Sequence, residues 1–257
     1  MSEPNIQVHR LHDVLYVTFD RPEKLNAMTW EMYARLESAC REAEADDVRA
    51  MVLQSSSPRA FIAGTDITQF QSFDSGRDGV DYERKIDGVI DAILSVPVPT
   101  IAAVDGYCVG GGFLISAACD LRIATTSAQF GAPMARTLGN CLSQHSYRLI
   151  VELLGRSTAF DLLLRARLMT AAEAHQRGFV AELCAAGQIS VVVESEAERL
   201  KNHSPLSMRA AKTSLNRLLF EPDRSNDDVL EQVYGSHDFR EAVERFGARQ
   251  DPKWSGR

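Results

Sequence analysis

Three consecutive glycines, Gly110 to Gly112, constrain most strongly how this chain can fold. They end an apolar, strand-like stretch and lead directly into a helix-like one. Three adjacent glycines lose much backbone entropy on folding, so a fold retains them where a backbone must approach another group closely. At a helix start, free N–H groups and the positive end of the dipole favour an oxygen that carries negative charge. The run therefore predicts either a tight turn packed on a neighbour or part of an oxyanion hole.

The composition indicates a globular protein of one large domain or of a domain with a small extension. Of its 257 residues, 45% are hydrophobic and 25% are charged, as in ordinary globular proteins. The net charge of −7 disfavours general binding to nucleic acid or to anionic membranes. The five cysteines are scattered, without a Cys-x-x-Cys pair, so we expect neither a metal site nor disulfides. With no apolar leader at the N-terminus, this pattern favours a cytoplasmic protein.

Strand-like and helix-like stretches alternate through about 190 residues, and only helix-like stretches follow. Strands are expected at residues 14–19, 50–54, 100–104, 121–124 and 180–183. Helices are expected at residues 29–45, 82–94, 146–154 and 157–164, with helix starts at Thr170 and Ser204. The polar stretch 72–81 is expected to form a mobile loop. This order indicates an α/β core over residues 1–200 and a helical extension over residues 201–257.

Two segments share one pattern, an apolar strand that passes through glycine into a helix. They are F-I-A-G-T-D-I at residues 61–67 and V-D-G-Y-C-V-G-G-G-F at residues 104–113. Each turn can offer a backbone N–H, and two donors fix the position of an oxyanion that one donor holds loosely.

These segments and three others resemble motifs of the crotonase superfamily, the enoyl-CoA hydratase/isomerase family. Each motif is weak by itself, but the five occur in the family's order and spacing, from about residue 10 to the C-terminus. The matching segments are R-P-E-K-L-N-A at 21–27, F-I-A-G-T-D-I at 61–67, A-A-V-D-G-Y-C-V-G-G-G at 102–112, C-D-L-R-I-A at 119–124 and A-Q-F-G-A-P at 128–133.

The resemblance implies a ClpP/crotonase-like spiral of ββα units that binds an acyl-CoA thioester. It assigns the oxyanion hole to the N–H groups of Thr65 and Gly111, and it implies no cofactor beyond the CoA moiety of the substrate. Two rigid donors at a thioester oxygen can each lower the barrier to enolate formation by roughly 3–4 kcal/mol. The family's CoA-binding loops correspond to Arg21, Lys24, Leu25, Ala27, Ala63, Asp66 and Ile67.

The helical extension resembles the family's C-terminal helices, which assemble trimers that often pair into hexamers. The resemblance implies a homotrimer or a dimer of trimers, in which the extension reaches toward a neighbour's CoA site. Candidates for the apolar face that needs a partner are Val229, Val233 and Val243. The part that resembles the helix reaching a neighbour's CoA site contains Phe246, Arg249 and Lys253, for which helix-capping or surface roles remain open.

The chain departs from the family at the two glutamates with which its hydratases move protons. Leu114 stands at the first position and Met134 at the second. Neither side chain can carry a proton, and each lost acid or base costs roughly 10²–10⁴-fold in rate. We therefore expect little ordinary crotonyl-CoA hydration, and the more apolar site favours a bulky or aliphatic acyl chain.

Two polar residues near these positions are candidates for the missing chemistry. His145 lies in the polar region 139–145 and can serve as acid or base, because histidine as a residue type changes charge near neutral pH. Arg136 can bind a substrate carboxylate. Surface or helix-start roles remain open for both, and we interpret Asp66 and Asp120 as mainly structural.

Two functions remain open from the sequence. The first is an acyl-CoA enzyme that stabilises an enolate and uses unusual polar groups. The second is a non-catalytic acyl-CoA-binding or assembly protein, which the missing glutamates favour. A serine hydrolase is disfavoured because the chain has no G-x-S-x-G motif. P-loop and dinucleotide-binding folds are disfavoured because the chain lacks the glycine motifs typical of them.

Overall fold

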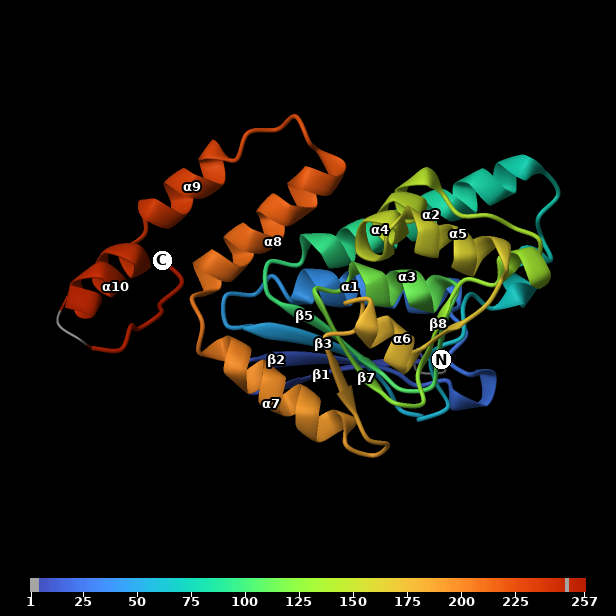
Figure 1. Ribbon diagram of the computed structural model, residues 1–257, viewed down its shortest axis with the longest axis horizontal. Helices are drawn as coiled ribbons and strands as arrows, with labels where there is room; N and C mark the ends of the chain where they lie inside the picture. Colours follow the sequence, from blue (N-terminus) through green and yellow to red (C-terminus); the bar gives the residue numbers. More distant parts are fainter. Residues whose placement is uncertain (1–4, 248–249) are drawn as a thin grey trace.

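The computed structural model describes residues 5–247 and 250–257. In this part of the chain, a six-stranded sheet runs through the body of the molecule, with helices above and below it (Figure 1). Its first two strands are antiparallel and all other neighbours are parallel. In order across the sheet, the strands are β1 (Ile6–Leu11), β2 (Val14–Phe19), β3 (Ala50–Ser55), β5 (Thr100–Val104), β7 (Leu121–Thr125) and β10 (Glu182–Cys184).

A second sheet of short strands lies beside the first. It consists of β4 (Ala60–Ile62), β6 (Tyr107–Val109), β8 (Gln129–Gly131) and β9 (Met169–Thr170). Three successive units each contain a strand of the large sheet, a strand of the small sheet and a helix, namely β3–β4–α2, β5–β6–α3 and β7–β8–α4. The chain therefore winds as a spiral of ββα units, which confirms the expected fold class.

Helices cover both faces of the large sheet (Figure 1). One face packs against helices of the spiral, and the other packs against α7. The helices are α1 (Trp30–Glu42), α2 (Gly76–Ser95), α3 (Gly111–Ala118), α4 (Gln144–Leu154), α5 (Arg156–Leu164), α6 (Ala171–Gln176), α7 (Ile189–Lys201), α8 (Pro205–Phe220), α9 (Asp227–Tyr234) and α10 (His237–Gly247).

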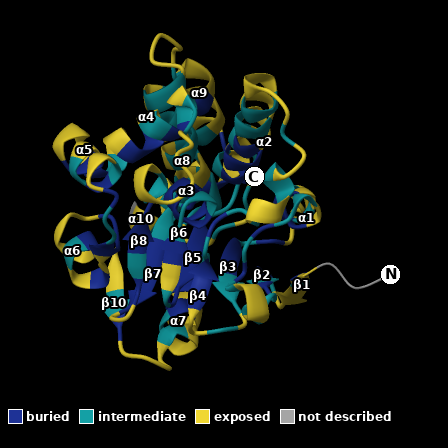
Figure 2. Ribbon diagram, turned by 90° about the vertical axis from the view of Figure 1, so that its right-hand side faces the viewer, coloured by how far each residue is buried: buried dark blue, intermediate teal, exposed yellow. Residues whose placement is uncertain are grey.

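Side chains alternate between the two faces of strand β2, as the pleat of a strand requires. Leu15 and Val17 join the core beneath the spiral's helices, whereas Val14 and Tyr16 join the core that α7 covers. Both faces of the central strands are thus buried, and Figure 2 shows β3, β5 and β7 largely in the buried colour, whereas the edge strand β1 is mostly exposed.

The prediction of a loop over residues 72–81 is wrong for residues 76–81, because α2 begins at Gly76. The Asp78 carboxylate accepts a hydrogen bond of 2.7 Å from the Ser75 N–H and so satisfies the helix start. Strand β1 and the short strands β6 and β8 were not expected from the sequence.

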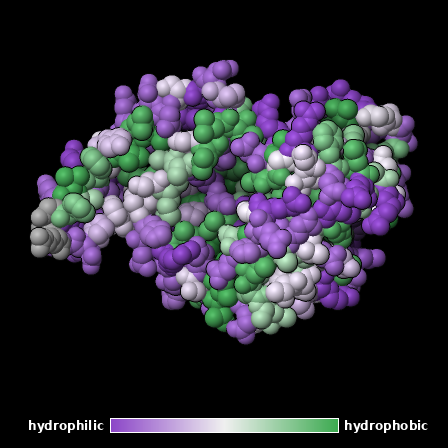
Figure 3. All heavy atoms as spheres, in the orientation of Figure 1, coloured by the Kyte–Doolittle hydropathy of each residue, from purple (hydrophilic) through white to green (hydrophobic). Residues whose placement is uncertain are grey.

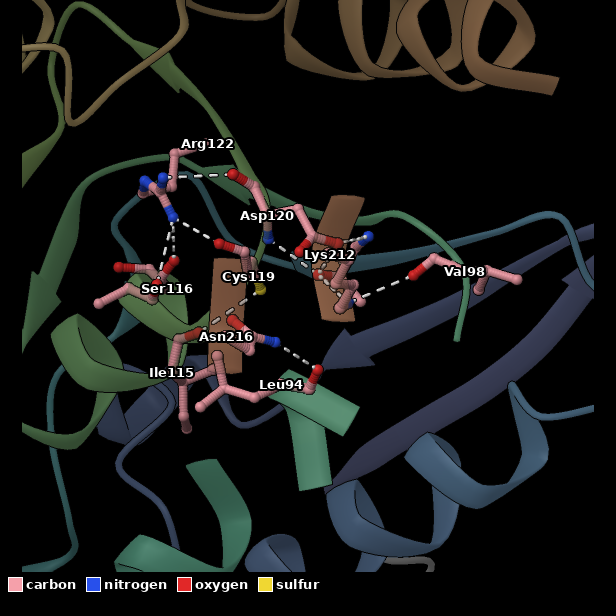
Figure 4. Close-up of polar contacts among 11 residues, drawn as sticks. Leu94, Val98, Ile115, Ser116, Cys119, Asp120, Arg122, Lys212 and Asn216 are labelled. Atoms are coloured by element: carbon pink, nitrogen blue, oxygen red, sulfur yellow. Dashed lines mark hydrogen bonds and ion pairs between the residues drawn. The ribbon is translucent and has the colours of Figure 1, made fainter. Parts of the chain in front are cut away.

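The extension forms an arm of α8, α9 and α10 that projects from the spiral (Figure 1). Helix α8 is fastened to the spiral, because Lys212 Nζ lies 2.8 Å from Asp120 Oδ2 and Asn216 Nδ2 donates to Leu94 O at 2.9 Å (Figure 4). Asp120 also accepts the Thr100 N–H at 2.7 Å. These contacts support the structural role expected for Asp120.

Apolar side chains reach the surface along the arm (Figure 3). Val229 is buried and Val233 is half-buried, but Val243 is 57% and Phe246 is 87% exposed. Lys253 is exposed, and Arg249 lies outside the described residues. Trimer formation through this face stays a prediction.

No helix in the described part of the chain is long and apolar enough to cross a bilayer. No group of three or more His, Cys, Asp or Glu side chains in residues 5–247 and 250–257 is arranged to hold a metal ion.

Replacing Lys212 with Met tests whether α8 is fastened through Asp120. The Lys212 side chain is 9% exposed, and its removal leaves the partly buried carboxylate of Asp120 without its cation. We expect the free energy of unfolding to fall by about 2 kcal/mol, measured by urea denaturation. Lys24→Met, at an exposed position, is the control and should change it by less than about 0.5 kcal/mol. Equal effects of the two substitutions would contradict the fastening role.

Candidate functional site

The two glycine-containing turns lie against each other at the start of α3. A Cβ atom on Gly112 would lie 2.3 Å from the carbonyl oxygen of Ile62, and one on Gly110 would lie 3.5 Å from Cα of Gly64. Gly110 also has a φ of +57°, which other residues rarely adopt, and its N–H donates to Gly131 O at 2.9 Å. Glycine is therefore required for this approach, and the prediction of a close backbone contact is confirmed.

This approach leaves two backbone donors beside one cavity. In the described residues, the N–H groups of Thr65 and Gly111 donate no hydrogen bond to protein. The Gly111 N–H is the first of α3, where a helix offers no partner. Both residues line a cavity of about 350 Å³. The arrangement can bind an anionic oxygen with two backbone donors and the positive end of a helix dipole.

A chain of hydroxyl groups holds the Thr65 turn. Thr65 Oγ1 lies 2.7 Å from Tyr33 Oη and 2.8 Å from Tyr82 Oη. Burial raises the pKa of Tyr82 to about 12 and raises the pKa of Tyr33 as well, so both phenols remain protonated at neutral pH. The two tyrosines come from α1 and α2, and they fix the turn that carries the Thr65 N–H.

The loops expected to bind CoA are joined by an ion pair. Arg21 Nη1 lies 2.7 Å from Asp66 Oδ2 and also donates to Ala27 O at 2.9 Å. The Arg21 guanidinium, together with hydrogen bonds from Thr68, lowers the pKa of Asp66 to about 2. Arg21 and Asp66 thus hold the two loops together, and Arg21 is engaged within the protein.

Four further residues expected at the CoA site lie on the same pair of loops. Ala63 N donates to Leu25 O at 3.1 Å, so the backbones of the two loops are in direct contact. Lys24 is exposed at the end of a 3-10 helix (Pro22–Lys24), and Ile67 is 60% exposed at the rim of the cavity. The structure brings all the expected CoA-binding residues onto this one pair of loops, and their binding of CoA stays a prediction.

The positions of the family's two glutamates form part of the cavity wall. Leu114 on α3 and Met134, which begins a 3-10 helix (Met134–Arg136), both line the cavity. The departure seen in the sequence is therefore a departure inside the site, where two acids are replaced by apolar surface.

Neither polar candidate for the missing chemistry lies in the cavity. His145 stacks on Phe220 of α8 with 4.3 Å between ring centroids, and its Nε2 lies 3.2 Å from Asp91 Oδ1 of α2. Arg136 is exposed on the far end of its 3-10 helix. Both residues are absent from the described cavity lining, so this arrangement argues against the expected roles. The reason is helical phase, since a helix start at Gln144 turns His145 toward α2 and α8.

The structure instead brings Glu83 of α2 into the cavity wall. Its Oε2 accepts a hydrogen bond of 2.7 Å from the Ser143 N–H. Burial and, to a smaller extent, nearby Asp87 raise the pKa of Glu83 to about 7, against the lowering effect of that hydrogen bond. Sequence reasoning missed Glu83 because the residues around it match no motif and because Ser143 is 60 positions away.

Comparison with known proteins identifies the family. The model of the enoyl-CoA hydratase/isomerase family matches residues 10–257. The chain belongs to the enoyl-CoA hydratase/isomerase family. It is thus a member of a family of acyl-CoA enzymes and has the crotonase fold. Leu114 and Met134 occupy the positions of the two glutamates of the family's hydratases.

Relatives of this family member cover almost the whole chain. A protein of Rhizobium meliloti named "Probable enoyl-CoA hydratase" is 29% identical over 100% of both chains. The (E)-benzylidenesuccinyl-CoA hydratase of Thauera aromatica is 28% identical over 95% of this chain and 96% of its own. The crystal structure of an enoyl-CoA hydratase/carnithine racemase from Magnetospirillum magneticum superposes with a TM-score of 0.91, at 26% identity over 100% of this chain and 97% of the other.

Two glycine substitutions should change stability in opposite directions. Gly112→Ala places a Cβ against Ile62 O and should lower the free energy of unfolding by about 2 kcal/mol or more. Gly79→Ala, inside α2 with no atom within 4 Å of its Cβ, should raise it by about 0.5–1 kcal/mol. Urea denaturation of both variants measures the difference. A Gly112→Ala protein as stable as the wild type would show that the close approach is not required.

The stability of the protein should depend on Glu83 in a pH-dependent way. Its pKa of about 7 exceeds the value near 4.5 of an unfolded chain, so the folded state loses stability as pH rises through that interval. Glu83→Gln should therefore raise the free energy of unfolding at pH 8 by about 1–2 kcal/mol, after allowance for solvent screening, and have little effect at pH 4.5. Denaturation curves at both pH values test this. An equal gain in the free energy of unfolding at both pH values would contradict a pH-dependent role of Glu83. The control is Glu152→Gln, at an exposed position.

Proposed function

We propose that this family member is an enzyme that stabilises the enolate of an acyl-CoA thioester. The observation that carries the proposal is the pair of unused N–H groups, from Thr65 and Gly111, beside one cavity. When a thioester loses an α-proton, its carbonyl oxygen gains negative charge, and two fixed donors stabilise that charge more than the neutral ground state. No cofactor beyond the CoA moiety is needed for this step.

The shape of the cavity supports a bulky acyl group. A second hollow of about 670 Å³ adjoins the first and shares six of its lining residues. Its wall includes Phe70, Phe73, Val80, Leu138 and Leu142, which favour long aliphatic or aromatic chains. Leu114 and Met134 extend the same apolar surface toward the thioester position.

CoA would lie over the loops that the Arg21–Asp66 pair holds together. Lys24 is exposed there and supplies a positive charge for a phosphate. We further propose a homotrimer or a dimer of trimers, in which a second copy covers the exposed side chains of Val243 and Phe246.

The alternative is a protein that binds acyl-CoA without turning it over. The apolar residues at positions 114 and 134 favour this alternative, because they remove the acids with which the family's hydratases work. The two functions differ in whether the protein moves a proton on a bound thioester.

A matched pair of substitutions tests the oxyanion hole. Proline fits the first position of a helix and removes the Gly111 N–H, whereas alanine keeps that N–H. Both are made in a Tyr33→Phe background, because Tyr33 Oη would lie 2.7 Å from the new Cβ. For an acyl-CoA that the wild type deuterates in D₂O, Gly111→Pro should reduce kcat/KM by about 10²–10³ relative to Gly111→Ala.

Three outcomes of these assays are distinct. A large difference between the two variants supports enolate stabilisation at Gly111. Equal kcat/KM values would remove the Gly111 N–H from the mechanism. Calorimetric binding of acyl-CoAs without deuteration of any of them would support the non-catalytic alternative.

A further inference from the structure

The cavity contains a carboxyl group at a position that the family's pattern does not assign. Among the described residues that line it, Glu83 is the one carboxylate, and the other titratable group is Tyr82. Glu83 lies on α2, whereas the substituted positions Leu114 and Met134 lie on α3 and on the loop after β8. The cavity therefore still has a carboxylic acid side chain, but on a different wall from the two glutamates of the family's hydratases.

The Glu83 carboxyl group is held from one side. Its Oε2 accepts the Ser143 N–H at 2.7 Å, and the Ser143 hydroxyl donates to Asp87 Oδ1 at 2.5 Å. Ser143 is also the N-cap of α4, accepting the Ser146 N–H at 3.0 Å, so its position is fixed. Glu83 Oε1 makes no hydrogen bond within the described residues. One oxygen is anchored and the other is available to a ligand.

The charged groups around Glu83 leave its proton exchangeable near neutral pH. On α2, Asp87 disfavours the ionised form, and Arg84 pairs with Asp81 on the outer surface. From α4, His145 pairs with Asp91 of α2 one turn beyond Asp87. The Ser143 N–H favours the carboxylate, and burial raises the pKa to about 7.

The remaining neighbours of Glu83 carry no formal charge. Tyr33 of α1 is close enough that, besides burial, the Glu83 carboxylate contributes to the raised pKa of its phenol, which therefore stays protonated, as does that of Tyr82. The walls from α3 and from the loop after β8 present Leu114 and Met134.

We propose that Glu83 is the catalytic residue that moves the proton at the α-carbon of the bound thioester. In the forward step, the α-carbon C–H bond breaks and an O–H bond forms at Glu83 Oε1. The electron pair of the C–H bond moves onto the thioester oxygen held by the N–H groups of Thr65 and Gly111. The proton then returns to the α-carbon or, in a 3-enoyl thioester, to the γ-carbon. This proposal rests on the proposed function.

One carboxyl group suits the relocation of a double bond better than the addition of water. Hydration needs one group to activate water and another to manage the α-proton. The described cavity wall provides Glu83 and a tyrosine, Tyr82, whose hydroxyl is already 2.8 Å from Thr65 Oγ1. A 3-enoyl thioester needs a single group that accepts a proton and returns it two carbons away, with no co-reactant.

Deuterium exchange in D₂O tests the role of Glu83 in the full-length protein. The probes are a 3-decenoyl-CoA and phenylacetyl-CoA, whose α-protons are acidified, and mass spectrometry follows deuterium uptake. Glu83→Gln should reduce the exchange rate at least 100-fold, while calorimetry gives a dissociation constant within about threefold of the wild type. Glu83→Asp, which keeps a carboxyl group, should exchange at least tenfold faster than Glu83→Gln. Exposed Glu152→Gln is the control and should exchange as the wild type does.

The pH profile separates a proton carrier from a residue that only supports the fold. The step requires the carboxylate, so wild-type exchange should rise with pH and level off above about 7. The residual exchange of Glu83→Gln should lack that rise. Circular dichroism and melting curves establish that each variant is folded.

The outcomes distinguish this proposal from the proposed function. Wild-type exchange that persists in folded Glu83→Gln would overturn the role of Glu83 and leave enolate stabilisation in place. Tight binding of both probes with no exchange by the wild type would overturn the proposed function, and the role of Glu83 with it. Loss of exchange in Glu83→Gln with rescue by Glu83→Asp supports both.

Discussion

The site depends on how closely the start of α3 approaches the end of β4. The position where Gly112 would carry a Cβ lies 2.3 Å from Ile62 O, so a larger residue would push the helix away from the strand. Because α3 can approach, the turn that contains Thr65 and the first turn of α3 border the same cavity. The hydroxyl chain from Tyr33 through Thr65 to Tyr82 then fixes the Thr65 turn. Loss of conformational freedom at the glycines is the cost of this geometry.

The same scaffold separates two tasks within the cavity. In the function we propose, the backbone provides the donors for the oxyanion, and backbone groups are retained whatever side chains surround them. Proton transfer depends on side chains, and here Leu114 and Met134 have replaced the acids of the family's hydratases. Glu83 enters from α2, anchored by Ser143 on the loop that precedes α4. Under our proposal, the oxyanion position is fixed by the backbone while the acid has moved to another wall of the same cavity.

Local patterns predicted the fold well, and long-range contacts explain what they missed. The Thr29 and Thr170 caps and the glycine run follow from short-range rules, and the structure contains them. The spiral of ββα units was implied by the resemblance of five motifs to a known family. Strands β6 and β8 have three residues each, too few for a periodic signal. His145 and Glu83 show the limit at the site. Their orientation depends on the phase of α4 and on the packing of α2 against the loop 137–143, which no spacing in the sequence encodes.

The position of a bound thioester can be determined by a crystal structure with a non-hydrolysable acyl-CoA analogue, in which a methylene group replaces the thioester sulfur. We expect the analogue's carbonyl oxygen within about 3.1 Å of both the Thr65 and the Gly111 backbone nitrogens. We also expect the α-carbon to face the cavity wall that contains Glu83. A carbonyl oxygen bound elsewhere, with either N–H pointing away from it, would show that these two donors do not form an oxyanion hole.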